Sequence, residues 1–210
     1  FTDADLAGAD LSGASMKRTV ISGAIMDQTR LEDVDMSDVL RAPPAEVYVD
    51  ERPLAEVLSA HEAYCESNGA RGLVTRLAGV DFRPLRSLAG RRLTALVAPG
   101  AIFFGLDLQG VHLQGADLSG ADFRGADLSG ADLRGARLTG AQFTRADVRG
   151  AQLGPLMIAE GRFARTDFTR ATLRNTDLRG AKAQRCRFLE ADMTGAHLEG
   201  CDLTDAELEV

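Results

Sequence analysis

The chain has 210 residues, a formal net charge of −7, few aromatic residues and no tryptophan. The acidic balance argues against a general nucleic-acid binder, and no apolar run is long enough to cross a bilayer. The start of the chain has no signal-peptide pattern, and the scarcity of aromatics suits a narrow interior filled by leucine and alanine.

Residues 1–40 carry a large apolar residue at every fifth position. The series is Phe1, Leu6, Leu11, Met16, Ile21, Met26, Leu31 and Met36. Neither an α-helix nor a flat strand has a period of five, so internal repetition takes precedence over local propensity. Because Phe1 is already in phase, we expect that the chain begins within a longer protein.

Residues 41–76 interrupt the repeat. A proline pair excludes helix near the start of this insertion, whereas Pro53 suits the first turn of a helix. Apolar or aromatic residues then recur at spacings of three and four, at Leu54, Val57, Leu58, His61, Tyr64 and Cys65. This spacing predicts an amphipathic helix over residues 53–67 that ends near Gly69, with His61 as a packed core residue.

The five-residue repeat resumes at residue 77 and runs to residue 210, with a slip of one residue near Pro84. Its unit is Ala-Asp-Leu-x-Gly, and it is most regular over residues 105–150. The large apolar positions of this stretch and its flanks are Leu108, Leu113, Leu118, Phe123, Leu128, Leu133, Leu138, Phe143, Val148 and Leu153.

The Ala-Asp-Leu-x-Gly unit resembles the pentapeptide-repeat family. That resemblance implies an all-β fold, a right-handed quadrilateral parallel β-helix with four repeats in each coil. The central Leu or Phe and the small residue two places before it would point inward. Residues 1–40 would then form about two coils and residues 77–210 about six to seven, with residues 41–76 as an inserted α-helical segment.

A coil of four pentads places residues twenty apart in one column. The prediction is one aromatic column of Phe103, Phe123, Phe143 and Phe163, and a second column that holds Phe168 and Phe188. The slip near Pro84 adds Phe82 at the foot of the first column. Strands roughly 4.8 Å apart would allow the rings to stack between coils.

Four apolar residues fall at positions that should face outward, namely Val97, Ile102, Phe104 and Met157. A cluster of exposed apolar side chains usually has a cover. We therefore interpret them as a candidate surface for a partner or for docking of the predicted helix, with that helix lying across Val97, Ile102 and Phe104.

The same column arithmetic predicts an outward line of acidic residues at Asp107, Asp127, Asp147 and Asp167. Arginines occur beside it, so a self-compensating solvated surface is the interpretation that we favour. Some pentapeptide-repeat proteins mimic DNA and bind type II topoisomerases such as gyrase, and this is the alternative. DNA carries one charge per ~1.7 Å, whereas this line offers one per ~4.8 Å.

The residue pairs that catalysis requires do not occur in the pattern. The three histidines have no partner at ligand spacing, and Cys65, Cys186 and Cys201 lack metal-site spacing. We expect space-filling thiols in a reducing, cytoplasmic setting. The sequence therefore predicts a protein that is not an enzyme and that has no cofactor or metal.

Three functional hypotheses remain. The first is a rigid scaffold that presents charged faces and an inserted helix to a protein partner, or to another domain of the same polypeptide. The second is a DNA-mimicking binder of a type II topoisomerase. The third is a structural element that self-assembles by end-to-end stacking of coils, because uncovered coil ends expose unpaired backbone groups. No membrane and no direct nucleic-acid partner is expected.

Overall fold

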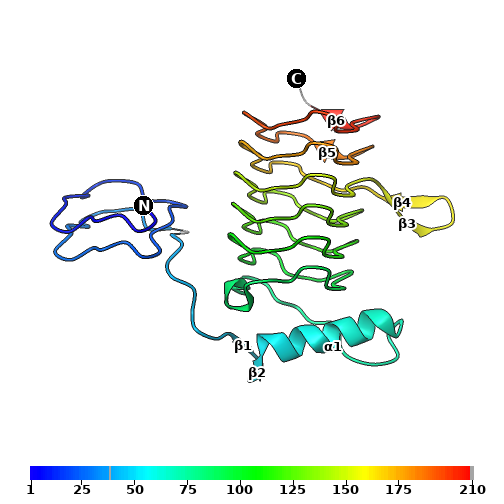
Figure 1. Cartoon of the computed structure of the whole chain (residues 1–210), viewed down its shortest axis with the longest axis horizontal. Helices are drawn as coiled ribbons and strands as arrows, with labels where there is room; N and C mark the ends of the chain where they lie inside the picture. The colour runs from blue at the N-terminus through cyan, green and yellow to red at the C-terminus, as the bar shows by residue number, and fades with distance from the viewer. Residues whose placement is uncertain (38, 209–210) are drawn as a thin grey trace. The chain divides into compact units, whose positions relative to one another are not determined.

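The structure is a computed structural model, and it describes residues 1–37 and 39–208. The chain divides into two compact units, Phe1–Ala45 and Glu46–Val210. Each unit is built from square coils whose neighbouring backbones form parallel bridges (Figure 1).

The first unit contains two coils. Its parallel bridges join residues twenty apart, as in Asp5 with Ile25 and Asp10 with Arg30. Met16, Ile21 and Leu40 form its buried core, whereas Leu31 at a central position of the second coil is exposed. A two-coil stack therefore buries few of its central side chains.

The second unit begins with a small ribbon and a helix. Strands β1 (Tyr48–Val49) and β2 (Arg52–Pro53) pair in antiparallel fashion and lead into α1 (Leu54–Glu66). The helix forms where the spacing of apolar residues predicts it, and it lies across the N-terminal end of the coils (Figure 1). Leu54, Val57 and Leu58 belong to the same core cluster as the central residues of the coils.

The main stack has four columns of central residues, one for each side of the coil. One outward column is bridged from coil to coil through Ser87, Asp107, Asp127, Asp147, Asp177 and His197. The 3₁₀ turn η1 (Arg83–Leu85) absorbs the extra residue near Pro84, and Arg86 after it has a positive φ of 62°. At the last coils β5 (Arg187–Phe188) pairs in parallel with β6 (Glu207–Leu208).

Where a pentad has an aspartate at its outward bridge position, that residue has a structural role. Its Oδ1 accepts a hydrogen bond from the backbone N–H two residues later, which closes the turn in the manner of an Asx turn. Bonds of this type run from Ser129 to Asp127, from Arg149 to Asp147 and from Arg179 to Asp177, at 2.9–3.1 Å. The inward positions before and after it are filled by buried alanine and leucine.

The aromatic columns confirm the twenty-residue coil but correct one position. The rings of Phe82, Phe103, Phe123 and Phe143 stack in order, with centroids 4.5–4.8 Å apart. Phe168 and Phe188 stack at 5.1 Å in the neighbouring column. The placement of Phe163 in the first column is wrong, because Phe163 lies outside the coils and is 52% exposed.

A β-hairpin accounts for this error. Strands β3 (Leu156–Ala159) and β4 (Arg162–Ala164) leave the stack and return to it (Figure 1). Across them the coil partner of Arg137 is Asp167, thirty residues later rather than twenty. The extra segment is thus two pentads long, so it leaves the five-residue phase unbroken while it shifts every later residue by half a coil.

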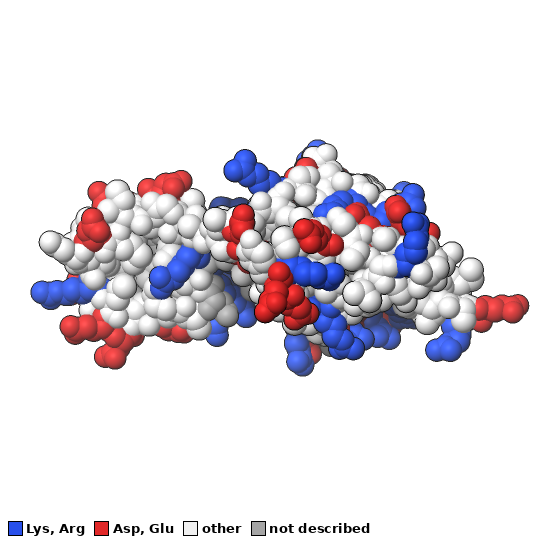
Figure 2. Space-filling view, turned by 90° about the horizontal axis from the view of Figure 1, so that it is seen from below, with Lys and Arg blue, Asp and Glu red and all other residues white. Residues whose placement is uncertain are grey.

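The charged surface is mixed. On the face of the main unit that Figure 2 shows, acidic and basic side chains lie beside one another rather than in separate patches. Over the described residues, no helix has the length and apolar character needed to span a membrane.

Candidate functional site

Side chains of α1 take the place of a further coil at the N-terminal end of the main stack. Inside the stack the carbonyl of Gln114 accepts the N–H of Ala95 from the coil before it, at 2.8 Å. At the first coil the equivalent carbonyl of Thr94 instead accepts from His61 Nε2 at 3.1 Å and from the Cys65 thiol at 3.4 Å. The helix therefore satisfies an edge that would otherwise be an unpaired strand.

An acidic residue completes the cap. Glu62 accepts the backbone N–H of Arg92 at 3.2 Å, where another coil would offer a carbonyl. Its carboxylate also accepts hydrogen bonds from Arg91 Nε at 2.9 Å and from Arg91 Nη2 at 2.5 Å. The Arg91 hydrogen bonds hold the pKa of Glu62 below its ordinary value.

The docking of α1 on Val97, Ile102 and Phe104 stays a prediction, and the polar contacts of the helix with the coils lie at other residues. The polar contacts of α1 go to Arg91, Arg92 and Thr94 in the first coil, and its apolar residues close the core. Val97, Ile102 and Phe104 lie half-buried in their coils, and Arg124 stacks over the Phe104 ring at 5.5 Å. Apolar spacing predicted the helix, but it did not say which part of the coils the helix covers.

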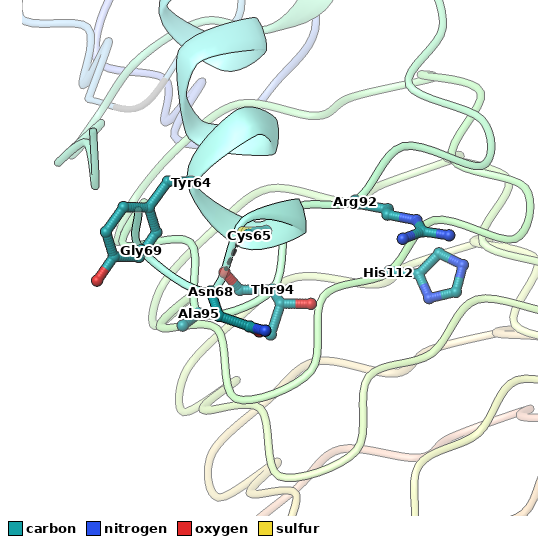
Figure 3. A pocket seen from close by; sticks show the side chains of 8 residues that line it. All are labelled: Tyr64, Cys65, Asn68, Gly69, Arg92, Thr94, Ala95 and His112. Carbon is teal, nitrogen blue, oxygen red and sulfur yellow. Dashed lines mark hydrogen bonds between the residues drawn. The ribbon is translucent and has the colours of Figure 1, made fainter. Parts of the chain in front are cut away.

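A cavity opens beside the C-terminal end of α1 (Figure 3). It has a volume of about 380 Å³ and is lined on the helix side by Tyr64, Cys65, Asn68 and Gly69. Arg92, Thr94, Ala95 and His112 line the side that belongs to the coils. Figure 3 shows Arg92 and His112 next to each other, across the cavity from Tyr64.

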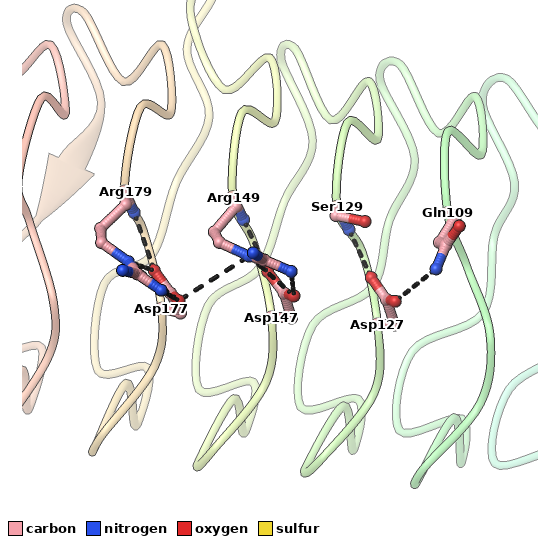
Figure 4. Close-up of polar contacts among 7 residues, drawn as sticks. All are labelled: Gln109, Asp127, Ser129, Asp147, Arg149, Asp177 and Arg179. Atoms are coloured by element: carbon pink, nitrogen blue, oxygen red, sulfur yellow. Dashed lines mark hydrogen bonds and ion pairs between the residues drawn. The ribbon is translucent and has the colours of Figure 1, made fainter.

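The acidic line is only partly the one that the spacing predicted. Asp107, Asp127 and Asp147 share a column, but the next member is Asp177, because the hairpin shifts Asp167 into the column of Arg137 and Arg187. Within the line, each of Asp147 and Asp177 is clamped by the arginine two residues later (Figure 4). Asp127 accepts from Ser129 and from Gln109.

Arginines neutralise two of the four carboxylates in the line, Asp147 and Asp177, whereas Asp107 and Asp127 accept from uncharged donors. Arg179 lowers the pKa of Asp177 to about 2 through its hydrogen bonds, and Arg149 lies 3.8 Å from the same carboxylate. The negative charges of Asp147 and Asp177 are therefore matched by guanidinium groups on the same face. This surface is therefore not a continuous acidic stripe.

The hairpin exposes three large apolar side chains as a group, and Leu73 and Val74 form a second exposed apolar pair in the main unit. Met157 faces Phe163 across the two strands, and Ile158 lies at a register shift between them. Their side chains are 65%, 52% and 55% exposed, in the order Met157, Phe163 and Ile158. Sequence reasoning singled out Met157 but missed Ile158 and Phe163, because both fall at central positions of the five-residue phase.

The hairpin is fixed at its base. Leu156 packs where a side chain at Gly135 would stand, since a Cβ there would meet the Cβ of Leu156 at 2.7 Å. The buried Thr166 hydroxyl accepts the N–H of Gly135 at 2.9 Å and bonds to the carbonyls of Leu133 and Gly154. The Thr166 side chain therefore provides the hydrogen-bond acceptor that a neighbouring backbone carbonyl provides elsewhere in the stack, at the place where the chain leaves the coil.

A small groove of about 210 Å³ lies at the foot of the hairpin. Ion pairs surround it, with Arg137 bonded to Asp117 at 3.2 Å and both Arg165 and Arg187 bonded to Glu207. The hairpin thus combines an apolar tip with a charged foot, which is the distribution that protein interfaces commonly show.

The described residues contain no group of three His, Cys, Asp or Glu side chains that could hold a metal ion. Their three cysteines are free thiols. Burial raises the pKa of the Cys186 thiol to about 12, and burial also raises the pKa of Cys65 and of Cys201. High thiol pKa values oppose nucleophilic chemistry at neutral pH.

Comparison with family models gives a match to "Pentapeptide repeats", in 8 copies. The matched residues are 1–38, 101–140, 126–154, 159–182 and 173–209. The comparison with curated proteins gives no match.

Among solved structures the chain is similar to HetL, a pentapeptide repeat protein involved in heterocyst differentiation regulation from the cyanobacterium Nostoc sp. strain PCC 7120. The identity is 27% over 99% of this chain and 88% of that one, with a TM-score of 0.39. Rfr23 from the cyanobacterium Cyanothece 51142 is 21% identical over 65% of this chain and 89% of its own, with a TM-score of 0.30.

QnrB1, a plasmid-mediated fluoroquinolone resistance protein, is a further similar structure. Its full-length form is 21% identical, covers 62% of this chain and 73% of its own, and has a TM-score of 0.31.

Proposed function

The chain belongs to the pentapeptide-repeat family, and we propose that it is a non-catalytic scaffold whose hairpin at residues 155–164 binds a protein partner. The exposure of Met157, Ile158 and Phe163 on a ribbon that leaves the coils is the observation that carries this proposal. Buried apolar and aromatic anchors dominate the energy of most protein interfaces, and the rigid stack holds these three in place.

The proposal is tested by affinity capture with variants of the intact chain. Replacing both Met157 and Phe163 with serine removes the apolar tip without touching the coils. The matched control replaces Leu73 and Val74 with serine, a pair exposed by 59% and 51% in the segment after α1. We expect the first variant to lose the partner that the parent retains and the control to keep it. Equal retention by both variants would contradict the proposal.

The DNA-mimic alternative receives less support. Its predicted acidic line consists of carboxylates that close turns within their own pentads and that are paired with Arg149, Arg179 or amide groups. A supercoiling assay with a type II topoisomerase separates the alternatives, because a DNA mimic would inhibit the enzyme even without the apolar tip.

Self-assembly by end-to-end stacking also receives less support. At the N-terminal end of the main stack, α1 occupies the edge groups that another copy would need. Light scattering after size-exclusion chromatography tests this alternative, which requires a molecular mass that grows with concentration.

A further inference from the structure

The cavity beside the end of α1 is lined by the cation of Arg92, which has no counter-charge within 4 Å among the described residues. Most arginines of the main unit have a carboxylate within 4 Å, as Arg91 has in Glu62 and Arg134 has in Asp132. For the Arg92 side chain, the part of the chain that the structure describes offers no such carboxylate. Arg92 is exposed at the wall of the cavity.

A second donor stands beside it. Arg92 and His112 are bridge partners on adjacent coils, so their side chains lie in one outward column (Figure 3). The Gln114 amide donates to His112 Nδ1 at 3.3 Å and to Asp132 at 2.7 Å, and its oxygen accepts from Thr94. Because Nδ1 accepts this bond, the ring carries its proton on Nε2, which is left to donate.

The opposite wall is mostly apolar, with Asn68 as its polar member. The Tyr64 ring packs over Gly69, where a Cβ would stand 3.3 Å from three of its atoms. Ala95 and the Cys65 side chain lie between this ring and the donors, and the Cys65 thiol is engaged with the Thr94 carbonyl. The cavity therefore combines donors for an anion with a surface for a hydrocarbon or aromatic body.

We infer that this cavity binds a small organic anion whose carboxylate or phosphate group is held by Arg92 and His112 and whose apolar body lies against Tyr64 and Ala95. A guanidinium binds either oxyanion through paired N–H groups, so the two head groups share one chemistry. Since the walls come from α1 and from the first two coils, the ligand also fastens the helix to the stack and stabilises the protein.

Calorimetric titration of the intact chain tests the inference with four probes. Benzoate and phenyl phosphate supply the two head groups on an aromatic body, inorganic phosphate lacks the body, and benzylamine reverses the charge. We expect one or both aromatic anions to bind and to raise the thermal midpoint. We expect inorganic phosphate to bind more weakly and benzylamine to show no binding.

The variant Arg92→Gln is expected to lower the affinity for the aromatic anion by about tenfold or more, because a charge-assisted hydrogen bond is lost. Arg145→Gln is the matched control, since Arg145 has no ion partner among the described residues and does not line the cavity. As a second measurement, the bound anion should slow alkylation of Cys65 but not of Cys201. The inference is overturned by failure of both aromatic anions to bind, by equal binding of benzylamine or inorganic phosphate, or by an unchanged affinity in Arg92→Gln.

Discussion

At the scale of single residues, the cap depends on a buried histidine in one protonation state. His61 is 1% exposed, its Nε2 donates to Thr94, and its Nδ1 has no partner among the described residues. Burial lowers the pKa of His61, and the charged neighbours are Glu62 and the Arg91 that is paired with it. A proton on Nδ1 would add a buried charge and an unpaired donor.

The first prediction follows from the sign of this shift. The unfolded chain takes up a proton near the ordinary pKa of about 6.5, while the folded cap resists it until a lower pH. Stability of the cap is therefore complete above about pH 6.5 and is lost as pH falls below that value. The protection of the α1 amides against hydrogen exchange, after correction for the intrinsic pH dependence of amide exchange, should fall as the pH is lowered from 7.5 to 5. His61→Gln, which keeps a donor but does not titrate, should remove this change, and a persistent change would contradict the account.

A second prediction concerns the hydroxyl at the base of the hairpin. Thr166→Val leaves the half-buried N–H of Gly135 without its acceptor and should cost about 1–3 kcal/mol in unfolding free energy. Thr176→Val is the control, because among the described residues its hydroxyl bonds to the Phe143 carbonyl alone, and that carbonyl also accepts from Ala146. Denaturant unfolding compares the two. A larger loss in Thr176→Val would show that the acceptor role of Thr166 is wrong.

At the scale of elements, the base of the hairpin packs closely against the coil because Gly135 has no side chain. Gly135→Ala would place a Cβ 2.7 Å from that of Leu156, in addition to the strain of a positive φ of 67°. Gly125→Ala has a matching φ of 65° and no atom within 4 Å, so it carries the backbone strain alone, about 1–2 kcal/mol. Thermal unfolding should show a larger loss for Gly135→Ala. Equal losses would mean that the hairpin base is free to move away.

The elements also show what could be predicted from the sequence. The five-residue period predicts the coil and its two aromatic columns, and the spacing of three and four residues predicts α1. In each case one secondary structure brings all the apolar residues of the period to the same side. The hairpin could not be found from the period, since an insertion of two pentads preserves the phase. Its local signal was the run from Pro155 to Gly161, which loses the Ala-Asp pair and places Met157 and Ile158 together.

The candidate sites were less predictable for a related reason. Their residues meet through column positions, so the shift at the hairpin replaced Asp167 with Asp177 in the acidic line. The cavity beside α1 depends on where the helix lies on the stack, and a helical period contains no information about its partner surface. The twenty-residue spacing is sufficient to place Arg92 beside His112. It contains no information about the wall of the cavity that lies opposite them.

At the scale of the whole molecule, the chain forms two compact units, each of which contains a stack of coils. Each coil inside the main stack buries central side chains worth about 1.5–3 kcal/mol apiece, whereas the two-coil unit leaves several of its own half-exposed. Stability in solenoids is nearly a sum over neighbouring repeats. We therefore expect residues 1–37 to exchange their amide protons faster than residues 98–153. A chain of residues 46–210 should keep the main thermal transition within a few degrees, and loss of that transition would show that the two units fold as one.

The most direct measurement is quantitative partner capture by a chain from which residues 155–164 are deleted. The deletion joins Gly154 to Arg165 and restores a single pentad, with arginine at the position that Arg145 and Arg185 occupy. We predict that this chain retains its circular dichroism and cooperative unfolding but no longer retains the partner. Undiminished capture by the folded deletion variant would contradict the assignment of the hairpin as the binding element.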